Sequence, residues 1–321
     1  MKRYLIKRLI ESIPLLLGIT LISFFLMHLA PGDPTAMLID PKVKPEDLMR
    51  IKENLGLNKP IIIQYFIWLK NILGGNLGYS FITSKPVLGS ILEFLPATIL
   101  LMLSSLILTL IITIPLGVIS AVNKGKIIDN IVTVFSFIGM SIPTFWLALV
   151  IMLLFSMKLG WFPSSGISDS YLYGNNIFLK VMDVIRHMFL PLLTMTITSL
   201  AGLTRYQRAS MLEVIKQDYI IAARARGLSE RVVIFKHALK NAILSTITIL
   251  GLSLPGIFGG AFIIEYIFAW PGMGRFGVQA IFSRDYPVIM GIILFSSALI
   301  IIGNLLADIA YFWADPRIRK S

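Results

Sequence analysis

The apolar residues of this 321-residue chain are gathered into six long blocks, and this pattern constrains the fold more than any other feature. A helix rises about 1.5 Å per residue, so roughly 20 apolar residues cross the hydrocarbon core of a bilayer. Only 14% of the residues are charged, against about 25% in soluble proteins. We therefore predict an all-α polytopic membrane protein with six transmembrane helices, at residues 9–29, 97–122, 131–157, 188–204, 242–264 and 288–307.

Residue counts exclude several other classes of protein. The chain has no Cys, so a disulfide-stapled secreted fold, a thiolate zinc site and a cysteine nucleophile are all impossible. Four basic residues precede the first block, as in a secretory signal peptide. That block is longer than the roughly 7 to 15 apolar residues of a signal core, so we expect it to remain as a membrane span.

The distribution of Lys and Arg predicts how the spans are oriented. Six spans place both termini on one side, and basic residues mark the cytoplasmic side of a membrane. The segments on the side of the termini hold 17 basic residues in 66 positions, at 1–8, 123–129, 204–240 and 308–321. The opposite segments hold 12 in 120 positions, at 30–96, 158–187 and 265–287. Both termini are therefore predicted to be cytoplasmic, and this topology accounts for the net charge of +12 without nucleic-acid binding.

The outer segment 30–96 is too long to be a simple connection between spans. Pro45 can open a helix toward Leu55, and Pro60 can open a second helix that runs to Leu73 and ends at Gly74. The second helix is strongly apolar, so we expect it to lie against the membrane surface or the outer ends of the spans. Farther along, Tyr266, Phe268 and Trp270 are expected to form an interfacial aromatic belt.

The inner segment 205–240 carries eight basic residues and one Gly, at position 227, between two stretches that can form helices. After that Gly, an apolar stripe with helical spacing is formed by Leu228, Val232, Phe235 and Leu239. Such a helix could lie on anionic lipid or insert its stripe into a groove of a cytoplasmic partner. Composition alone leaves both interpretations open.

Specific residues of the inner segment resemble a known family. Residues 218–230 read Asp-Tyr-Ile-Ile-Ala-Ala-Arg-Ala-Arg-Gly-Leu-Ser-Glu, and residues 236–242 read Lys-His-Ala-Leu-Lys-Asn-Ala. This closely resembles the cytoplasmic loop of binding-protein-dependent ABC importer permeases, whose signature is Glu-Ala-Ala-x-x-x-Gly. Ala222, Ala223 and Gly227 match that signature, whereas Ile221 replaces its Glu. Ser245 stands where related peptide permeases often have Pro.

The resemblance extends over most of the chain and points to the dipeptide, oligopeptide and nickel branch, as a B-type permease subunit. The shared motifs occur in the order of the family, at 30–34, 55–60, 75–80, 96–98, 141–145, 265–268, 271–274, 284–287 and 315–319. Asn76 departs from the pattern, since the family usually has Asp there.

The resemblance implies a type I ABC importer permease fold. Its expected organisation is a first span at 1–29, an outer segment at 30–96, a permease core at 97–314 that includes a coupling loop at 205–240, and a cytoplasmic tail at 315–321. The implied partners are a second, related permease subunit in a heterodimer, two cytoplasmic ATPase subunits, an external substrate-binding protein and membrane lipid. The coupling residues carried over are Ala222, Ala223, Gly227, Leu228, Val232, Phe235 and Leu239.

The residues themselves permit this mechanism and weaken its competitors. The chain has no Walker A phosphate-binding motif, so energy from ATP would have to come from separate subunits. The second to sixth predicted spans contain no ionisable residue, which disfavours an ion-coupled secondary transporter, although sodium sites built from backbone carbonyls remain open. His28, His187 and His237 do not cluster in the sequence, so we predict no catalytic residue, cofactor or metal site.

The cargo is predicted through the resemblance alone. Peptides are the larger part of the branch, so an importer of di- or oligopeptides is expected. Nickel complexes or another small solute are the alternative. Several Pro and Gly residues within the spans can kink helices, but they assign no gate.

Overall fold

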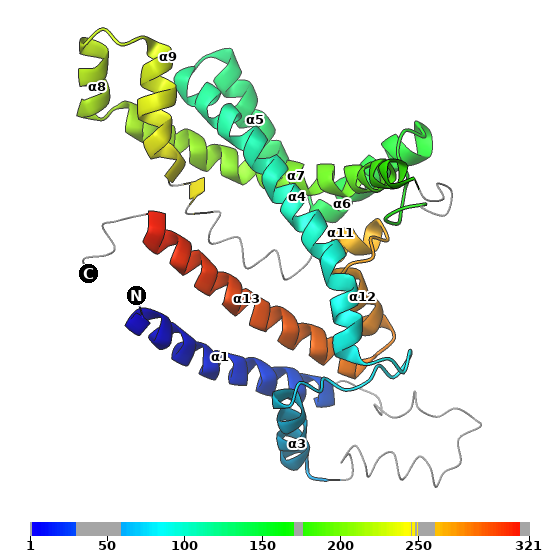
Figure 1. Ribbon diagram of the computed structural model, residues 1–321. Coiled ribbons are helices and arrows are strands. Elements are labelled where there is room, and N and C mark those ends of the chain that lie inside the picture. Colours follow the sequence, from blue (N-terminus) through cyan, green and yellow to red (C-terminus); the bar gives the residue numbers. More distant parts are fainter. Residues whose placement is uncertain are drawn as a thin grey trace.

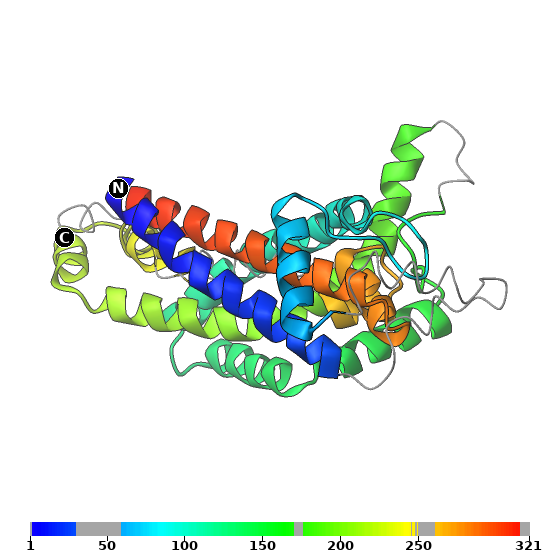
Figure 2. The same cartoon turned by 90° about the horizontal axis from the view of Figure 1, so that it is seen from below.

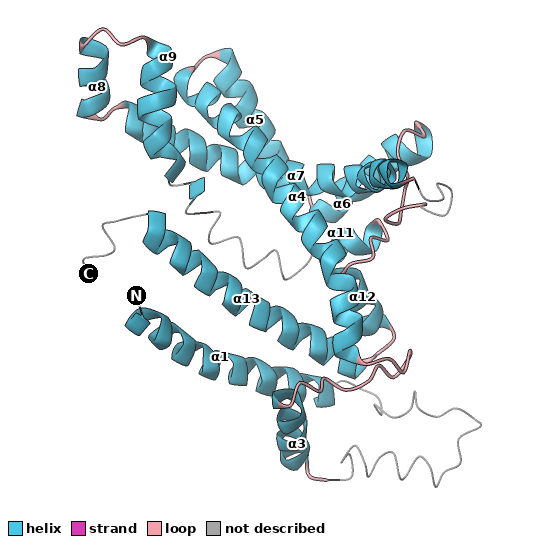
Figure 3. Cartoon of the chain, in the orientation of Figure 1, coloured by secondary structure: helices cyan, strands magenta, loops and turns pink. Residues whose placement is uncertain are grey.

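The computed structural model describes residues 2–29, 59–169, 176–244, 246, 247, 249 and 261–314. Within these ranges the regular elements are all helices (Figure 3), and the one β contact is an isolated bridge between Tyr79 and Pro86. The prediction of an all-α chain is confirmed. The main helices are α1 (Lys2–Leu29), α3 (Ile61–Leu73), α4 (Val87–Val122), α5 (Ile127–Ser141), α6 (Thr144–Ile151), α7 (Ile177–Ile215), α8 (Asp218–Ala225), α11 (Phe262–Ile267), α12 (Met273–Phe282) and α13 (Tyr286–Ala314).

Helices α1 and α13 form an antiparallel pair along one side of the molecule (Figures 1 and 2). The start of α1 and the end of α13 lie at the same end of this pair in both views. Helix α3 crosses the opposite end, where its buried Tyr65 packs against Phe24 of α1 and Met290 of α13. Pro60 caps the start of α3 and Gly74 its end, so the second predicted helix of the outer segment is confirmed.

Helices α4 and α7 pack against each other along their length and form the centre of the fold. Helix α4 begins at Val87, ten residues before the predicted span, and holds both Pro96 and Pro115 in its interior. Helix α7 contains the predicted span 188–204 but extends beyond it at both ends, with Pro191 inside it. A membrane-spanning helix tolerates such prolines when neighbouring helices cover the freed backbone groups.

Length and composition qualify only some of the described helices as membrane spans. Helix α4 and residues 286–305 of α13 are long and apolar enough to cross a bilayer by themselves. The pair formed by α5 and residues 144–158 would be a third if it acts as one span. The structure therefore supports two or three of the six predicted spans by this criterion. Most of the predicted span 242–264 lies outside the described residues.

The predicted span 131–157 is divided into two helices, because the chain bends by 102° between α5 and the following helix. Ile142 is extended, with φ −82° and ψ 124°, and Pro143 stands at the start of α6. The helical region is sterically disfavoured for a residue before Pro, and Pro has no N–H to continue the helix. Helix α6 then passes into a π-helical turn, η2 (Met152–Lys158).

Helices α11 and α12 fold around the buried carboxylate of Glu265. Its oxygens accept hydrogen bonds from Thr98 Oγ1 of α4 at 2.9 Å and from the Arg275 N–H at 3.1 Å. The predicted aromatic belt is wrong for Trp270 and Phe268, whose exposed fractions are 0% and 2%, whereas Tyr266 is exposed. Trp270 is buried because its indole N–H finds an acceptor, the carbonyl of Ala97, at 2.9 Å.

Several predictions lie outside the described residues. These are the first helix of the outer segment from Pro45 to Leu55, the motifs at 30–34, 55–58 and 315–319, the departure at Ser245, and Pro255 in the fifth predicted span.

Candidate functional site

The inner segment folds into two short helical pieces joined at Gly227. Helix α8 runs from Asp218 to Ala225, and α9 (Glu230–Val232) continues into the π-helical turn η4 (Val233–Ala238). Gly227 has φ +76°, a conformation that an L side chain adopts only with strain. The predicted division of the segment at this Gly is therefore confirmed, and its cause is the left-handed turn. Arg224 and Glu230 bridge the turn with an ion pair of 2.7 Å.

One face of these two pieces is buried against the ends of the long helices. Ile220 and Ala223 of α8 and Val233, Ile234 and Ala238 of η4 form a cluster with Val118 and Ala121 of α4 and Met211 of α7. Figure 1 shows α8 and α9 at the end of the molecule where α1 begins and α13 ends, and Figure 2 agrees. The helical pieces are thus attached to α4 and α7 by an apolar core.

The predicted stripe lies on the opposite, exposed face. Leu228 is 41% exposed, Val232 37% and Phe235 57%. Leu239 is half-buried and packs against the apolar core just described. The structure thus places three of the four stripe residues together at the surface, next to basic side chains such as Arg231 and Lys236, which are also exposed. Large apolar side chains gathered at a surface are typical of a docking site.

The predicted signature residues are divided between the two faces. Ala223 is buried in the apolar core, whereas Ala222 is exposed. Ile221, which replaces the Glu of the family signature, is 54% exposed. A methyl group added at Gly227 would meet no other atom within 4 Å, so this Gly serves the backbone turn and not a close approach to a neighbour.

A buried ion pair joins the end of α4, the start of α5 and the last third of α7 beside this site. The Asp129 carboxylate accepts bonds from Arg208 Nε at 2.7 Å and Arg208 Nη2 at 2.8 Å, from Ser120 Oγ at 2.5 Å and from the Gly125 N–H at 2.8 Å. Every oxygen of a carboxylate that is 4% exposed is thereby satisfied. This link was not found in the sequence, because its members are separated by as many as 88 positions, between Ser120 and Arg208.

Two further hydrogen bonds connect the segment to the start of the following helix. Tyr219 Oη accepts from Asn241 Nδ2 at 2.7 Å, and Ser210 Oγ donates to the carbonyl of Ala242 at 3.0 Å. These bonds hold the chain just after η4 against α7 and α8. The segment is therefore a packed unit attached to the spans and not a free loop.

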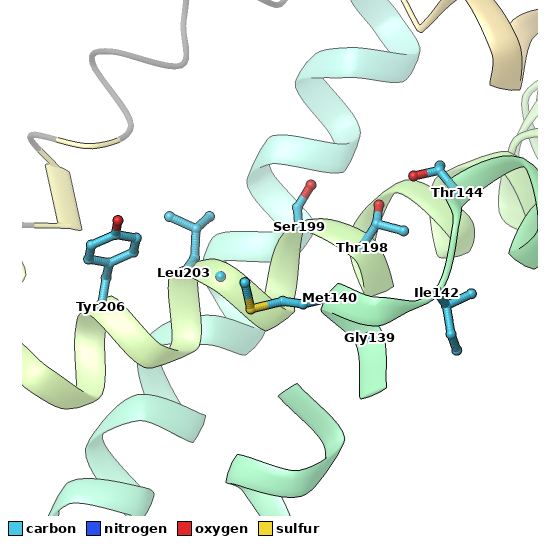
Figure 4. Close-up of a pocket in the computed structure, with 9 residues that line it drawn as sticks. Gly139, Met140, Ile142, Thr144, Thr198, Ser199, Leu203 and Tyr206 are labelled. Atoms are coloured by element: carbon cyan, nitrogen blue, oxygen red, sulfur yellow. The ribbon is translucent and has the colours of Figure 1, made fainter. Parts of the chain in front are cut away.

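A cavity of about 430 Å³ lies at the bend between α5 and α6, beside the middle of α7 (Figure 4). Thr144, Thr198 and Ser199 bring hydroxyl groups to it, and no charged residue lines it. The complete lining is Gly139, Met140, Ile142, Thr144, Thr198, Ser199, Gly202, Leu203 and Tyr206. The sequence did not predict these cavity-lining residues. Its one local signal is the Ser-Ile-Pro-Thr motif at 141–144, which lies at the bend.

Comparison with known proteins matches both parts of the chain. Residues 113–320 match the family described as binding-protein-dependent transport system inner membrane component, and residues 1–104 match the family of its N-terminal membrane component. The chain is 46% identical over 319 residues to an oligopeptide transport system permease protein of Bacillus subtilis, with 99% of each chain covered.

Other relatives carry similar descriptions. A dipeptide transport system permease protein of Alkalihalophilus pseudofirmus is 37% identical over 332 residues, covering 99% of this chain and all of the relative. A putative peptide transport system permease protein of Brucella abortus is 39% identical over 323 residues, covering 99% of each chain. These descriptions are of transport subunits and not of enzymes.

Proposed function

The chain belongs to the family of binding-protein-dependent transport system inner membrane components, and on that premise we propose that it is the permease subunit of an ABC importer for di- or oligopeptides. The relatives named as oligopeptide and dipeptide permeases support this cargo, since they align over 99% of the chain. Nickel or another small solute is the alternative cargo.

The proposed assembly places this subunit in a cytoplasmic membrane, beside a second, related permease and in contact with lipid. Two ATPase subunits bind from the cytoplasmic side, and a substrate-binding protein delivers cargo from the other side. Six spans with both termini in the cytoplasm are part of the proposal, supported by the excess of Lys and Arg in the segments on that side.

The observation that carries the coupling role is the exposed apolar stripe of Leu228, Val232 and Phe235. The stripe is exposed because the neighbouring Val233 and Ile234 are buried and fix the orientation of the helix. A stripe held outward by its own buried neighbours is suited to a groove in a partner. We assign the stripe and the exposed Ala222 to contact with the ATPase. Ala223 and Leu239, in the apolar core, and Gly227, at the turn, take part in coupling by holding the segment in this orientation.

A force applied to this stripe would reach the spans through rigid contacts. The buried face of α8 and η4 packs on α4 and α7, and the Asp129–Arg208 pair joins α5 to α7. Because tightly packed helices joined by a buried ion pair move as one rigid body, movement of the ATPase would rotate α4, α5 and α7 together.

The cavity at the bend of α5 and α6 is the proposed segment of the cargo path in this subunit. Its hydroxyl lining without charges suits the uncharged amide groups shared by all peptides. Replacing Ser199 by Trp, which would fill the cavity, is expected to reduce uptake while leaving the amount of bound ATPase unchanged. Unchanged uptake by this variant would refute the proposal that the cavity is part of the cargo path.

Uptake measurements decide the cargo. A strain without this gene is expected to lose uptake of labelled di- and oligopeptides, and the wild-type gene is expected to restore it. Loss of nickel uptake with normal peptide uptake would overturn the peptide assignment and favour the alternative.

A matched pair of variants tests the coupling site. Phe235→Asp is expected to lower the ATPase that co-purifies with the permease at least about tenfold, equivalent to about 1.4 kcal/mol. Phe282→Asp is the control, because Phe282 is 73% exposed on the outer helix α12. Normal ATPase content and normal substrate-stimulated hydrolysis in the Phe235 variant would refute the docking role, and would leave lipid contact as the function of the stripe.

The absence of Cys makes the topology directly testable. Single cysteines in place of the exposed Lys85 and Lys216 would be the only thiols in the chain. A membrane-impermeant maleimide added to intact spheroplasts or protoplasts is expected to label the Lys85→Cys variant. The Lys216→Cys variant is expected to be labelled only after the membrane is permeabilised. The reverse pattern would invert the proposed orientation.

A further inference from the structure

Three potential metal ligands meet at the outer end of α7, outside the coupling site and the cavity. They are Asp169, which precedes α7 in the chain, and Asp183 and His187, which stand one turn apart on α7. One ligand atom from each residue lies within 4.8 Å of the other two. The side chains of Asp183 and His187 are 5% and 2% exposed, and that of Asp169 is 49% exposed. The group is therefore buried on one side and open to solvent on the other.

The hydrogen bonds of His187 leave one of its nitrogens as a free electron-pair donor. Nδ1 lies 2.9 Å from the backbone carbonyl of Asp183. A carbonyl only accepts, so Nδ1 carries the proton in this bond, and the lone pair of the neutral ring is on Nε2. Among the described residues Nε2 makes no hydrogen bond, and its nearest charged atom is Asp169 Oδ2 at 3.7 Å. In this tautomer the ring turns the lone pair of Nε2 toward a carboxylate that is itself an acceptor.

The separation of these two acceptors is too long for a hydrogen bond and close to the spacing of two metal ligands. A direct N–H···O bond spans about 2.7 to 3.2 Å. Two ligands about 2.0 to 2.1 Å from a tetrahedral Zn²⁺ are about 3.3 Å apart. The observed 3.7 Å needs a shift of a few tenths of an ångström, which the half-exposed Asp169 can make.

The third group, Asp183, is held as a carboxylate by its own partners. Its Oδ2 accepts from Ser168 Oγ at 2.8 Å and from the Asp169 N–H at 2.6 Å. Its Oδ1 lies 3.3 Å from Nδ1 of His187, and a carboxylate oxygen in this position keeps a second electron pair for a metal ion. The bonds to Oδ2 fix Ser168 and Asp169 against α7.

We propose that Asp169, Asp183 and His187 bind a divalent transition-metal ion of the zinc class on the outer side of the protein. One imidazole and two carboxylates match the ligand preference of Zn²⁺, whereas Ca²⁺ and Mg²⁺ prefer oxygen ligands alone. The two carboxylates neutralise the charge of the ion. The bond from Nδ1 to a backbone carbonyl is the usual orienting contact of a metal-ligating His. The ion would fasten the chain at residue 169 to the outer end of α7.

This site differs from the sequence-based prediction of no metal ligands. That prediction looked for a cluster of His residues, and His28, His187 and His237 are far apart in the sequence. The pair Asp183 and His187 was visible as an i, i+4 spacing, but Asp169 joins it only through the fold of the preceding chain.

A titration of the purified full chain in detergent, freed of metal by a chelator, tests the proposal. The wild-type protein is expected to bind one Zn²⁺ per chain, and Co²⁺ in its place is expected to give visible absorption bands of a site with a nitrogen ligand. Asp169→Asn and His187→Gln are each expected to weaken Zn²⁺ binding at least about tenfold. Asp169 is half exposed, so its variant keeps the test valid if the His187 variant fails to fold.

His28→Gln is the matched control. Its Nδ1 also bonds the carbonyl four residues earlier, Phe24, at 2.9 Å, but its Nε2 faces the side-chain amide of Gln64 instead of a carboxylate. This variant is expected to bind Zn²⁺ as the wild type does. A wild-type protein that binds no Zn²⁺, or binding unchanged by Asp169→Asn, would overturn the proposal and leave an imidazolium–carboxylate pair at this position.

Discussion

Two ion pairs of equal length allow the energetic effect of burial to be measured within one chain. In both pairs the Nε of an Arg lies 2.7 Å from a carboxylate oxygen, for Arg208 with Asp129 and for Arg224 with Glu230. The Asp129 side chain is 4% exposed and the Glu230 side chain 65%. Chemistry and distance are thus held nearly constant while solvent access differs, so the two carboxylates can be compared by the same substitution to the amide.

We predict that Asp129→Asn destabilises the protein by about 3 to 5 kcal/mol, because it leaves the Arg208 charge partly buried without a counter-charge. The new amide also has one acceptor oxygen in place of two, so it cannot satisfy both Arg208 and the hydroxyl of Ser120 and the N–H of Gly125. Glu230→Gln is predicted to cost less than about 1 kcal/mol, the usual value of an exposed pair.

The free energy of unfolding of both variants can be measured in mixed micelles of a mild detergent and SDS. A double variant with Arg208→Gln separates the pair from its surroundings, since removal of both charges is expected to cost less than the sum of the single changes. Equal losses for Asp129→Asn and Glu230→Gln, or strict additivity in the double variant, would refute the argument that burial gives this pair its importance.

Three other predictions follow from single contacts. Gly227→Ala is expected to destabilise the turn by about 1 to 2 kcal/mol because residue 227 has a positive φ. Gly18→Ala, at a helical position of α1 where an added methyl group has open space, is expected to be neutral or stabilising. Equal effects of the two changes in thermal unfolding would contradict the claim that the backbone conformation requires Gly at position 227. Trp270→Phe removes the bond to Ala97 and is expected to cost about 1 kcal/mol in the same assay, and no loss would show that the bond is unimportant. Burial raises the pKa of Glu265 despite its hydrogen bonds. The contribution of this group to stability is therefore expected to be complete below the ordinary Glu pKa and to be lost as pH rises through the raised pKa. A gain in stability over that pH range would exclude a raised pKa for Glu265.

Local patterns predicted the elements whose signals lie close together in the chain. The apolar blocks at 9–29, 97–122 and 288–307 all lie in long helices, because a run of about 20 apolar residues satisfies its backbone only as a helix in lipid. Helix α3 begins after Pro60 and ends at Gly74 as predicted. Gly227 separates α8 from α9, since the left-handed turn needed there favours Gly over other residues.

Predictions failed where a long-range contact overrode the local pattern. Trp270 was assigned to a membrane interface from its residue type, but a carbonyl 173 positions away accepts its N–H and allows burial. The stripe of Leu228, Val232 and Phe235 has the same spacing as a buried stripe would have, and only the packing of Val233 and Ile234 turns it outward.

Sequence alone thus determined that this is a helical membrane protein, and its motifs identified the family, because hydropathy and short signatures are properties of neighbouring residues. Tertiary structure decided which face of the inner segment is exposed, where a cavity lies beside α7 and which polar groups meet. Asp129 with Arg208, and Asp169 with His187, are pairs of groups far apart in the chain. Their chemistry exists only after the fold has brought them within a few ångströms of each other.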